Sequence, residues 1–419
     1  MTIAARTTPY QARHTASAPR WALSPTAAFT GAALAYASLY LAAGAPTPLL
    51  VLFQREWGFP ASMLTVAFAA YAFALLAALL VAGSLSDHVG RRPVLVGALL
   101  VELVSMVMFV FAPNLGWVIA ARVVQGLATG AASSAFTAAL LELAPPRFRR
   151  WGGLIGSAAP AGGLGLGALL TGAAVQFTHS ANVIVFSTLT VIMALGTVVL
   201  YLTAETSARR PGALGSLVPR VTVPHPARRE FTAAVPVHLS AWMMAGLFMG
   251  LGPTIVRGVF HLDSGLVNGA TAFLAPGAAA VAGVLTGRLH GRRATLLGTT
   301  GVLVGTLIVA AGIAGGLLPV VWLGAAVSGS GFGAAFGGAL RLIGPHAQPH
   351  QRGGLFAAVF LVAYLSFGLP LIVAGQGVAS LGLLPTVLTY SGIAVLVAAA
   401  GLLTQLRLGR RDARVPVAA

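Results

Sequence analysis

Long apolar runs dominate the chain, and short polar segments separate them. A helix needs about 20 apolar residues to cross the hydrocarbon core of a bilayer. Open strands would leave backbone polar groups unpaired in lipid, and barrel strands would alternate polar with apolar residues, which these runs do not do. The pattern therefore predicts an all-α integral membrane protein with twelve transmembrane helices in a lipid bilayer. The predicted spans lie near residues 27 to 52, 61 to 82, 94 to 112, 117 to 140, 152 to 176, 182 to 203, 231 to 256, 265 to 286, 294 to 314, 317 to 340, 353 to 378 and 381 to 404.

The composition supports a membrane protein and excludes several function classes. Of the 419 residues, 57% are hydrophobic and 8% are charged, whereas a soluble domain is about a quarter charged. The chain contains no Cys, which excludes disulfides, thiolate metal sites and Cys nucleophiles, and no Lys, which excludes a Walker-type ATPase. A nucleic-acid partner is not expected, because no soluble domain of sufficient size is present.

The positive charges are distributed unevenly between the two sides of the predicted helices. All 25 positive residues are Arg, against 8 acidic residues, and 22 of them lie in the termini, the central loop and alternate loops. On the other side only Arg55 and Arg257 remain, and Arg122 lies within a span. The positive-inside rule therefore places both termini in the cytoplasm. The Arg-rich, Ser-containing N-terminus could alternatively be a transit peptide. The absence of Lys, together with abundant Ala, Gly and Arg, suggests a GC-rich bacterium and its inner membrane.

Two related halves are predicted on either side of a proline-rich cytoplasmic linker at 204–230. They are the six-helix bundles 27–203 and 231–404, between cytoplasmic tails at 1–26 and 405–419. Such a repeat places a pseudo-twofold axis along the membrane normal and allows a polar pathway between the halves of a monomer. Motifs match in the same order in both halves: Gly90-Arg91-Arg92 with Gly291-Arg292-Arg293, Gly152-Gly153-Leu154 with Gly353-Gly354-Leu355, Gly126 and Gly130 with Gly329 and Gly333, and Pro46-Thr47 with Pro253-Thr254.

The most specific motif is the loop 83–93, GSLSDHVGRRP. Gly83 and Gly90 permit a tight turn, while Asp87 and the Arg91-Arg92 pair can form charge-assisted bonds at helix ends. An arginine pair that only orients the helices is the simpler interpretation. The segment nevertheless resembles the loop 2-3 signature of the major facilitator superfamily.

That resemblance extends to twelve spans, cytoplasmic termini and two related halves. In this superfamily the loop forms a cytoplasmic latch between the halves, which implies that Asp87 and Arg91 form the latch with Glu142 as the candidate acid. The second-half copy has Arg288 where Asp87 would fall, so the latch is expected to be one-sided.

Three polar residues within spans are candidates for coupling. Arg122 and Gln125 match the superfamily's Arg-x-x-Gln-Gly signature, which implies coupling to a proton or to an anionic substrate group. Their alternative role is a satisfied interhelical bond. Glu102 is the only acid within a span and is a candidate proton carrier, with a packed neutral acid as the alternative. Arg122 is expected about two helical turns nearer the outer face than Glu102, which leaves their direct pairing open.

The substrate site is expected to be mostly apolar and aromatic, with Tyr36, Tyr40 and Trp242 on its walls. His238 is a weaker proton-carrier candidate, because a lone His is more often a hydrogen-bonded helix residue. Drug and proton exchangers of the superfamily often carry an acid in span 1 and a Gly-Pro pair in span 5. Both features are absent here, although Ala204-Glu205-Thr206 is similar to their Pro-Glu-Thr sequence.

The residues and the resemblance together predict a secondary transporter for a small molecule, with proton-coupled efflux of a lipophilic drug or metabolite as the leading hypothesis. No cofactor is expected other than a proton gradient. A facilitator or uptake symporter is the alternative within the same class. Outside it, a receptor on a carrier fold stays open, as does an intramembrane enzyme, which would need clustered Asp, His or Glu that the spans lack.

Overall fold

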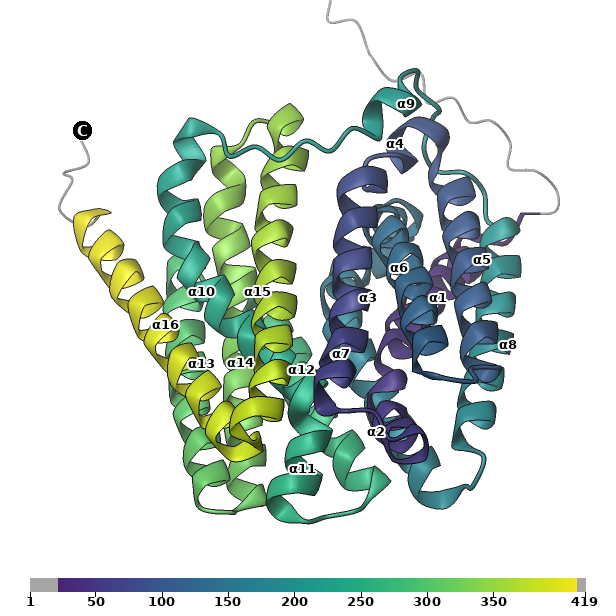
Figure 1. Ribbon diagram of the computed structural model, residues 1–419. Coiled ribbons are helices and arrows are strands. Elements are labelled where there is room, and N and C mark those ends of the chain that lie inside the picture. The colour runs from purple at the N-terminus through teal and green to yellow at the C-terminus, as the bar shows by residue number, and fades with distance from the viewer. Residues whose placement is uncertain (1–21, 413–419) are drawn as a thin grey trace, which may run out of the picture.

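The computed structural model describes residues 22–412 and forms two helical bundles side by side (Figure 1). Twelve helical segments within this range are long and apolar enough to span a membrane, which confirms the predicted number. The first bundle contains α1 (Pro25–Gly44), α2 (Pro46–Trp57), α3 (Ala61–Ala82), α4 (Ser86–Val89), α5 (Arg91–Val110), α6 (Leu115–Leu143), η1 (Pro146–Phe148), α7 (Arg149–Phe177) and α8 (Ala181–Tyr201).

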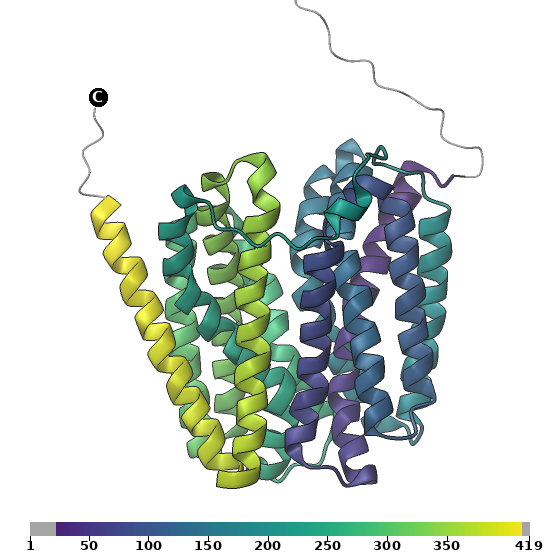
Figure 2. The ribbon, with the colours of Figure 1, turned by 45° about the horizontal axis from the view of Figure 1, so that its top comes forward.

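The second bundle follows a central linker that holds α9 (Ala213–Ser216) and η2 (His225–Ala227). It contains α10 (Arg228–Gly246), η3 (Leu247–Leu251), α11 (Gly252–Phe260), α12 (Gly265–Leu285), η4 (Thr286–Arg288), α13 (Gly291–Ala314), α14 (Leu318–Ile343), η5 (Gly344–His346), η6 (Pro349–Gln351), α15 (Arg352–Leu381) and α16 (Leu383–Asp412). We call the end of the molecule with the linker the linker end and the opposite end, with loops 58–60 and 261–264, the far end. The linker crosses from one bundle to the other at the linker end (Figure 2).

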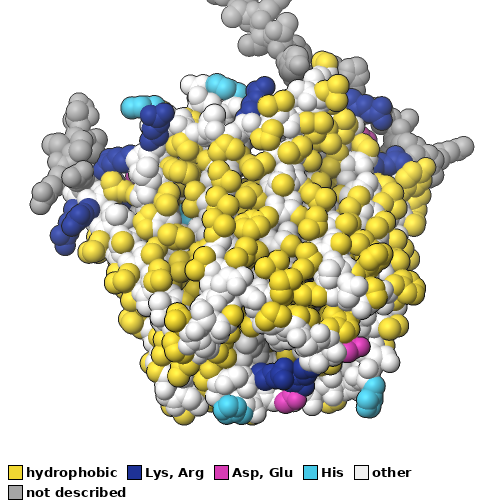
Figure 3. All heavy atoms as spheres, viewed as in Figure 1, with side chains coloured by type: hydrophobic (Ala, Val, Ile, Leu, Met, Phe, Trp, Pro, Cys, Tyr) yellow, Lys and Arg dark blue, Asp and Glu magenta, His cyan; other side chains and the backbone are white. Residues whose placement is uncertain are grey.

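A broad apolar band covers the face of both bundles, and most of the visible basic side chains lie at the linker end (Figure 3). Leu100, Val104, Leu195 and Leu396 are among the exposed apolar residues. In water this surface would be unfavourable, but lipid tails cover it without cost. The chain is therefore a multi-pass membrane protein.

The first span of each half is interrupted just before its Pro-Thr pair. A break at Ala45 precedes Pro46, and the π-helical segment η3 precedes Gly252-Pro253. Proline lacks the backbone N–H that a continuous helix would use, so the regular hydrogen-bond pattern of each span is interrupted there. The Pro-Thr match between the halves therefore marks an equivalent interruption of the helix.

Matching glycines allow equivalent helices to pack closely in the two halves. An added Cβ at Gly126 or Gly130 of α6 would lie 2.4 or 2.2 Å from a backbone oxygen of α3. An added Cβ at Gly329 or Gly333 of α14 would lie 2.2 or 2.1 Å from a backbone oxygen of α12. Small residues are common where membrane helices touch. The sequence repeat thus coincides with a repeated helix contact.

Two helices extend past the expected boundaries, while the predicted division into domains stays a prediction. The linker was expected to reach residue 230, but α10 begins at Arg228, and Glu230 lies in its first turn. The C-terminal tail was expected to start at 405, but α16 continues to Asp412. Long Arg side chains keep their charges in water while their helix continues, so a charged residue need not end a span. The expected tail 1–26 lies largely outside the described residues.

Candidate functional site

Arg91 is the centre of a charge cluster at the linker end. Its guanidinium lies 2.5 Å from the Asp87 carboxylate, 3.3 Å from the Glu142 carboxylate and 2.6 Å from the Ser86 hydroxyl. The short helix α4 and the start of α5 bring Asp87 and Arg91 together, and Glu142 in the last turn of α6 lies beside them. All of these contacts lie within the first bundle. The structure thus brings the predicted residues together, while their role as a latch between the halves stays a prediction.

Glu205, which follows α8, completes this cluster. Its carboxylate oxygens accept hydrogen bonds from the backbone N–H groups of Arg91, at 2.8 Å, and Arg92, at 3.1 Å. The first N–H groups of a helix have no partner within the helix, so this distant carboxylate caps α5. Gly90 allows the approach, because its φ is +106° and an added Cβ would lie 2.4 Å from a Glu205 oxygen.

The structural role of Glu205 was missed in the sequence, although the residue was noted for its Pro-Glu-Thr similarity. The sequence does contain a signal for this role. An acid follows one span and lies on the same side of the membrane as the Gly-Arg-Arg start of another helix. Among the other motif residues, Arg92 lies over the Tyr201 ring at 4.7 Å. The Gly83 carbonyl accepts from the Ser134 hydroxyl at 2.6 Å and ties the loop to α6.

The second half also carries an ion pair at the equivalent helix start, while the one-sided latch stays a prediction. Arg292, the counterpart of Arg91, lies 2.7 Å from the Glu230 carboxylate and donates to the Gln405 side chain at 2.7 Å. Its acidic partner comes from the first turn of α10. Position 288, which is equivalent to Asp87 in the first half, does not provide it. Only the packing of α10 and α16 against α13 brings these residues together.

A buried polar network lies within the first bundle. Gln125 accepts a hydrogen bond from Arg122 at 2.5 Å and donates one to the Glu102 carboxylate at 3.2 Å. Arg122 also donates to the backbone oxygens of Ala43 and Ala67, so α1 and α3 contribute acceptors. The second Glu102 oxygen is buried without a hydrogen-bond partner. The three candidates therefore form one connected group.

The expected axial offset between Glu102 and Arg122 is wrong. Helices α5 and α6 are antiparallel and joined by a short turn at the far end, and both residues lie about two turns from that turn. They therefore occupy the same layer of the bundle. Gln125 bridges them in place of a direct ion pair.

The network reaches the boundary between the bundles through aromatic side chains. The Arg122 guanidinium lies 4.1 Å from the centre of the Tyr71 ring, a cation–π contact. Tyr71 forms a small buried cluster with Ala43 and Leu75, against which Tyr364 of the second bundle packs. The predicted pair Tyr36 and Tyr40 instead bonds to α6, through Thr137 at 3.5 Å and Ser133 at 2.9 Å.

Trp242 is the centre of an aromatic cluster in the second bundle. Its ring lies 5.1 Å from that of Tyr364 and between 5.3 and 6.3 Å from three Phe rings. His238, one turn before it on α10, contacts Phe336 at 5.4 Å. The Nε1 of Trp242 and the Nε2 of His238 are both buried without a hydrogen-bond partner. The Phe residues around Trp242 are Phe332, Phe336 and Phe367.

Comparison with models of protein families shows which proteins this chain is related to. The model described as Major Facilitator Superfamily matches residues 32–370, which is most of the chain. The chain belongs to the Major Facilitator Superfamily. It is accordingly a membrane transporter and not an enzyme. No curated protein sequence matches it.

Solved structures share the superfamily fold at low sequence identity. The human organic anion transporter MFSD10 (TETRAN) is 18% identical, with a TM-score of 0.61 over 90% of this chain and 100% of that one. A POT family transporter in complex with a thioalcohol-conjugated peptide is 11% identical, with a TM-score of 0.72 over 91% and 96% of the two chains. A POT family transporter with 5-aminolevulinic acid is 11% identical, with a TM-score of 0.70 over 91% and 96%.

The two halves of this superfamily member are joined directly at the far end. Arg55 of α2 forms an ion pair with Asp263, which precedes α12. Ser264 donates a hydrogen bond to the Gln176 side chain of α7 at 2.8 Å. Beside it, an added Cβ at Gly172 would lie 2.4 Å from the Gly265 backbone oxygen, so α7 and α12 touch there.

At the linker end of the transporter, the linker itself contacts both halves. Its Arg210 N–H donates to the His88 carbonyl at 2.8 Å, and its Thr222 N–H donates to the Gly354 carbonyl at 3.2 Å. The linker is thus held by the backbone at one point in each half.

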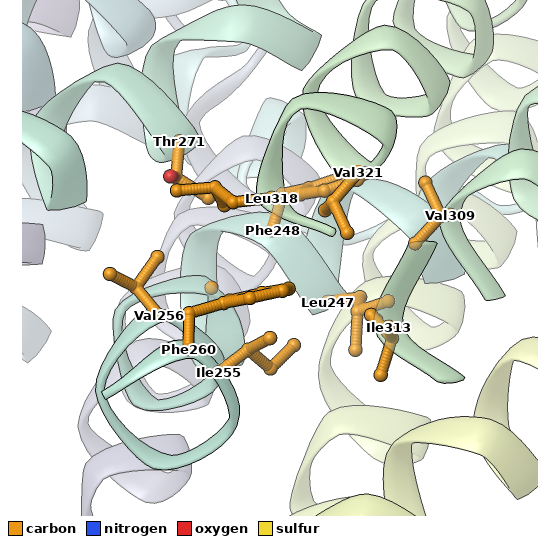
Figure 4. A pocket seen from close by; sticks show the side chains of 11 residues that line it. Leu247, Phe248, Ile255, Val256, Phe260, Thr271, Val309, Ile313, Leu318 and Val321 are labelled. Atoms are coloured by element: carbon orange, nitrogen blue, oxygen red, sulfur yellow. The ribbon is translucent and has the colours of Figure 1, made fainter. Parts of the chain in front are cut away.

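A narrow apolar crevice, without room for a water molecule, lies inside the second half of the transporter, beside the π-helical segment η3 (Figure 4). Its walls carry one polar side chain, Thr271, and the Thr271 hydroxyl already accepts a hydrogen bond from the Trp322 indole at 2.9 Å. With no polar group free to orient a ligand, the crevice is a feature of helix packing.

Proposed function

We propose that this transporter exports a lipophilic small molecule in exchange for protons, by alternating access between its two halves. The observation that carries the proposal is the buried Glu102 carboxyl, which Gln125 connects to Arg122. A carboxyl group inside a membrane is costly and is usually functional when it is present. Glu102 is the proposed proton carrier, and Arg122 changes the energy of its charged form.

The aromatic cluster around Trp242 is the proposed substrate site. Aromatic walls with a few polar groups suit a lipophilic compound. The Nε1 of Trp242 and the Nε2 of His238 provide those polar groups, because neither has a partner within the protein. Tyr364 contacts Trp242 and also packs on the cluster that contains Tyr71. A substrate bound at Trp242 would therefore shift Tyr364. Tyr364 packs on the cluster that contains Tyr71, whose ring covers Arg122.

Alternating access supplies the coupling between substrate and proton. The far-end bonds, Arg55 with Asp263 and Ser264 with Gln176, hold the halves together there and must break when that end opens. A ligand or proton shifts this equilibrium only if it binds the two states with different affinity. With the linker end in the cytoplasm, export requires that protonation of Glu102 favours opening toward the linker end.

Flux in reconstituted vesicles tests the proposal. The purified protein would be placed in liposomes with an internal pH-sensitive dye, and ethidium would be added under an imposed pH gradient. We expect proton movement that depends on ethidium and that is lost in Glu102→Gln. Ser105→Ala is the matched control on the same helix, since the Ser105 hydroxyl bonds only to the Ala121 carbonyl. Ethidium flux without proton flux would indicate a facilitator, and binding without flux a receptor.

A further inference from the structure

We infer that the far end of the protein carries a binding site for a small organic anion, in a pocket between the two halves. The pocket has a volume of about 570 Å³, within the range typical of small-molecule sites. The end of α2 in the first half and α11 in the second half form its walls. It is lined by Val51, Gln54, Arg55, Gly58, Phe59, Thr254, Arg257, Gly258 and His261.

The charge of the pocket favours an anion. Arg55 and Arg257 face it from opposite halves, close enough to repel each other. Within residues 22–412, Asp263 is the acid that pairs with Arg55, and no ion pair is formed by Arg257. Glu56 follows Arg55 in the chain but does not line the pocket. One positive charge is therefore left without a counter-ion, and His261 adds a further hydrogen-bonding group.

The helix ends keep the two arginines in place. Arg55 lies in the last turn of α2 and Arg257 in the last turn of α11, where a cation is favoured by the helix dipole. His261 ends α11 with φ of +55°, in the left-handed region that His adopts more readily than most residues other than Gly. His261 also lines the pocket.

The remaining lining groups define what else the ligand carries. The Thr254 hydroxyl oxygen is buried without a partner, and Gln54 provides a side-chain amide whose nitrogen already donates to the Phe59 carbonyl. Phe59 and Val51 form apolar walls. A carboxylate on an aromatic or aliphatic body matches this combination, because the carboxylate meets Arg257 and the body meets the apolar walls. The pocket is separate from the aromatic cluster at Trp242.

Fluorine NMR of a small aromatic carboxylate tests the site. The probe is 4-fluorobenzoate, added to the full-length protein in nanodiscs of zwitterionic lipid, with 4-fluorobenzyl alcohol as the neutral control. We expect saturable binding of the carboxylate, about ten-fold weaker binding in Arg257→Gln, and tighter binding in Asp263→Asn, which frees Arg55. Arg220→Gln, an exposed arginine of the linker, is the matched control and should bind as the unchanged protein does.

The opposite signs of the two far-end variants separate this proposal from a folding defect, because a misfolded protein would not bind more tightly. Equal binding in Arg257→Gln and the unchanged protein would overturn it, as would equal binding of the neutral alcohol. Loss of carboxylate binding when a fifth of the lipid is phosphatidylglycerol would also overturn it, since the pocket would then hold a lipid headgroup. Trp242→Phe should leave the affinity unchanged, so a failure here is distinguishable from a failure of the exporter proposal.

Discussion

Arg55 of the first half and Asp263 of the second form an ion pair that joins the two halves at the far end. The pair is partly exposed, with 32% of the Arg55 side chain and 66% of the Asp263 side chain accessible. Exposed ion pairs contribute about 0.2 to 1 kcal/mol. This pair therefore biases the closed far end and does not lock it.

Removing the pair should open the far end more often. We expect Asp263→Asn to raise the ratio of open to closed far ends by about 1.4- to 5-fold. This factor corresponds to the roughly 0.2 to 1 kcal/mol that an exposed ion pair contributes. The chain contains no Cys, so spin labels can be attached at Glu56→Cys and Leu262→Cys alone. The distance between the two labels, measured by electron paramagnetic resonance, should lengthen in Asp263→Asn. The exchange Arg55→Asp with Asp263→Arg should restore the short distance, and an unchanged distribution in Asp263→Asn would contradict the role of the pair.

Gln125 should be essential for the stability of the first bundle. Gln125→Leu leaves one Arg122 donor and one Glu102 oxygen without partners inside the bundle. Each unsatisfied buried group costs about 1 to 3 kcal/mol. We expect a clear fall in the unfolding temperature measured in detergent. Thr190→Val is the control, because the Thr190 hydroxyl bonds only to the Phe186 carbonyl of its own helix. Equal melting of the two variants would refute this role.

Because Glu205 caps α5, different substitutions of Glu205 should destabilise the first turn of α5 to different degrees. Glu205→Ala removes both acceptors for the Arg91 and Arg92 N–H groups, and loss of a helix cap costs about 0.5 to 2 kcal/mol. Glu205→Gln keeps one acceptor and should lie between Glu205→Ala and the unchanged protein. Hydrogen exchange of the first turn of α5 measures the effect. Gly90→Ala should destabilise the same turn, through its left-handed φ and the contact with Glu205, whereas Gly97→Ala should not, since an added Cβ there meets nothing within 4 Å.

Trp242 offers a test that separates substrate binding from folding. Trp242→Phe keeps an aromatic ring and removes an N–H that has no partner within the protein. We expect the unfolding temperature to stay the same or to rise, because no hydrogen bond is lost. The KM for a transported substrate should rise by about 2- to 10-fold, the value of one hydrogen bond. A lower unfolding temperature with an unchanged KM would assign Trp242 to packing alone.

The sequence alone determined the class of the protein and the layout of its helices. Span number depends on hydrophobic length, which is a local property, and the twelve predicted runs are the twelve found. The internal repeat of the two halves could also be predicted. A glycine that lets two helices approach closely must recur wherever that helix contact recurs. Gly126 with Gly130 and Gly329 with Gly333 make equivalent contacts for this reason.

The tertiary structure decided which polar residues meet. Glu205 and Arg91 are far apart in the chain, and the antiparallel packing of α8 beside α5 brings the acid to the helix start. The same holds for Glu230 with Arg292, and for the layer that Glu102 shares with Arg122. A hydrophobic pattern reports how long a helix is and which solvent surrounds it. Its rotation and depth are set by the helices packed against it, and partners across helices follow only from these.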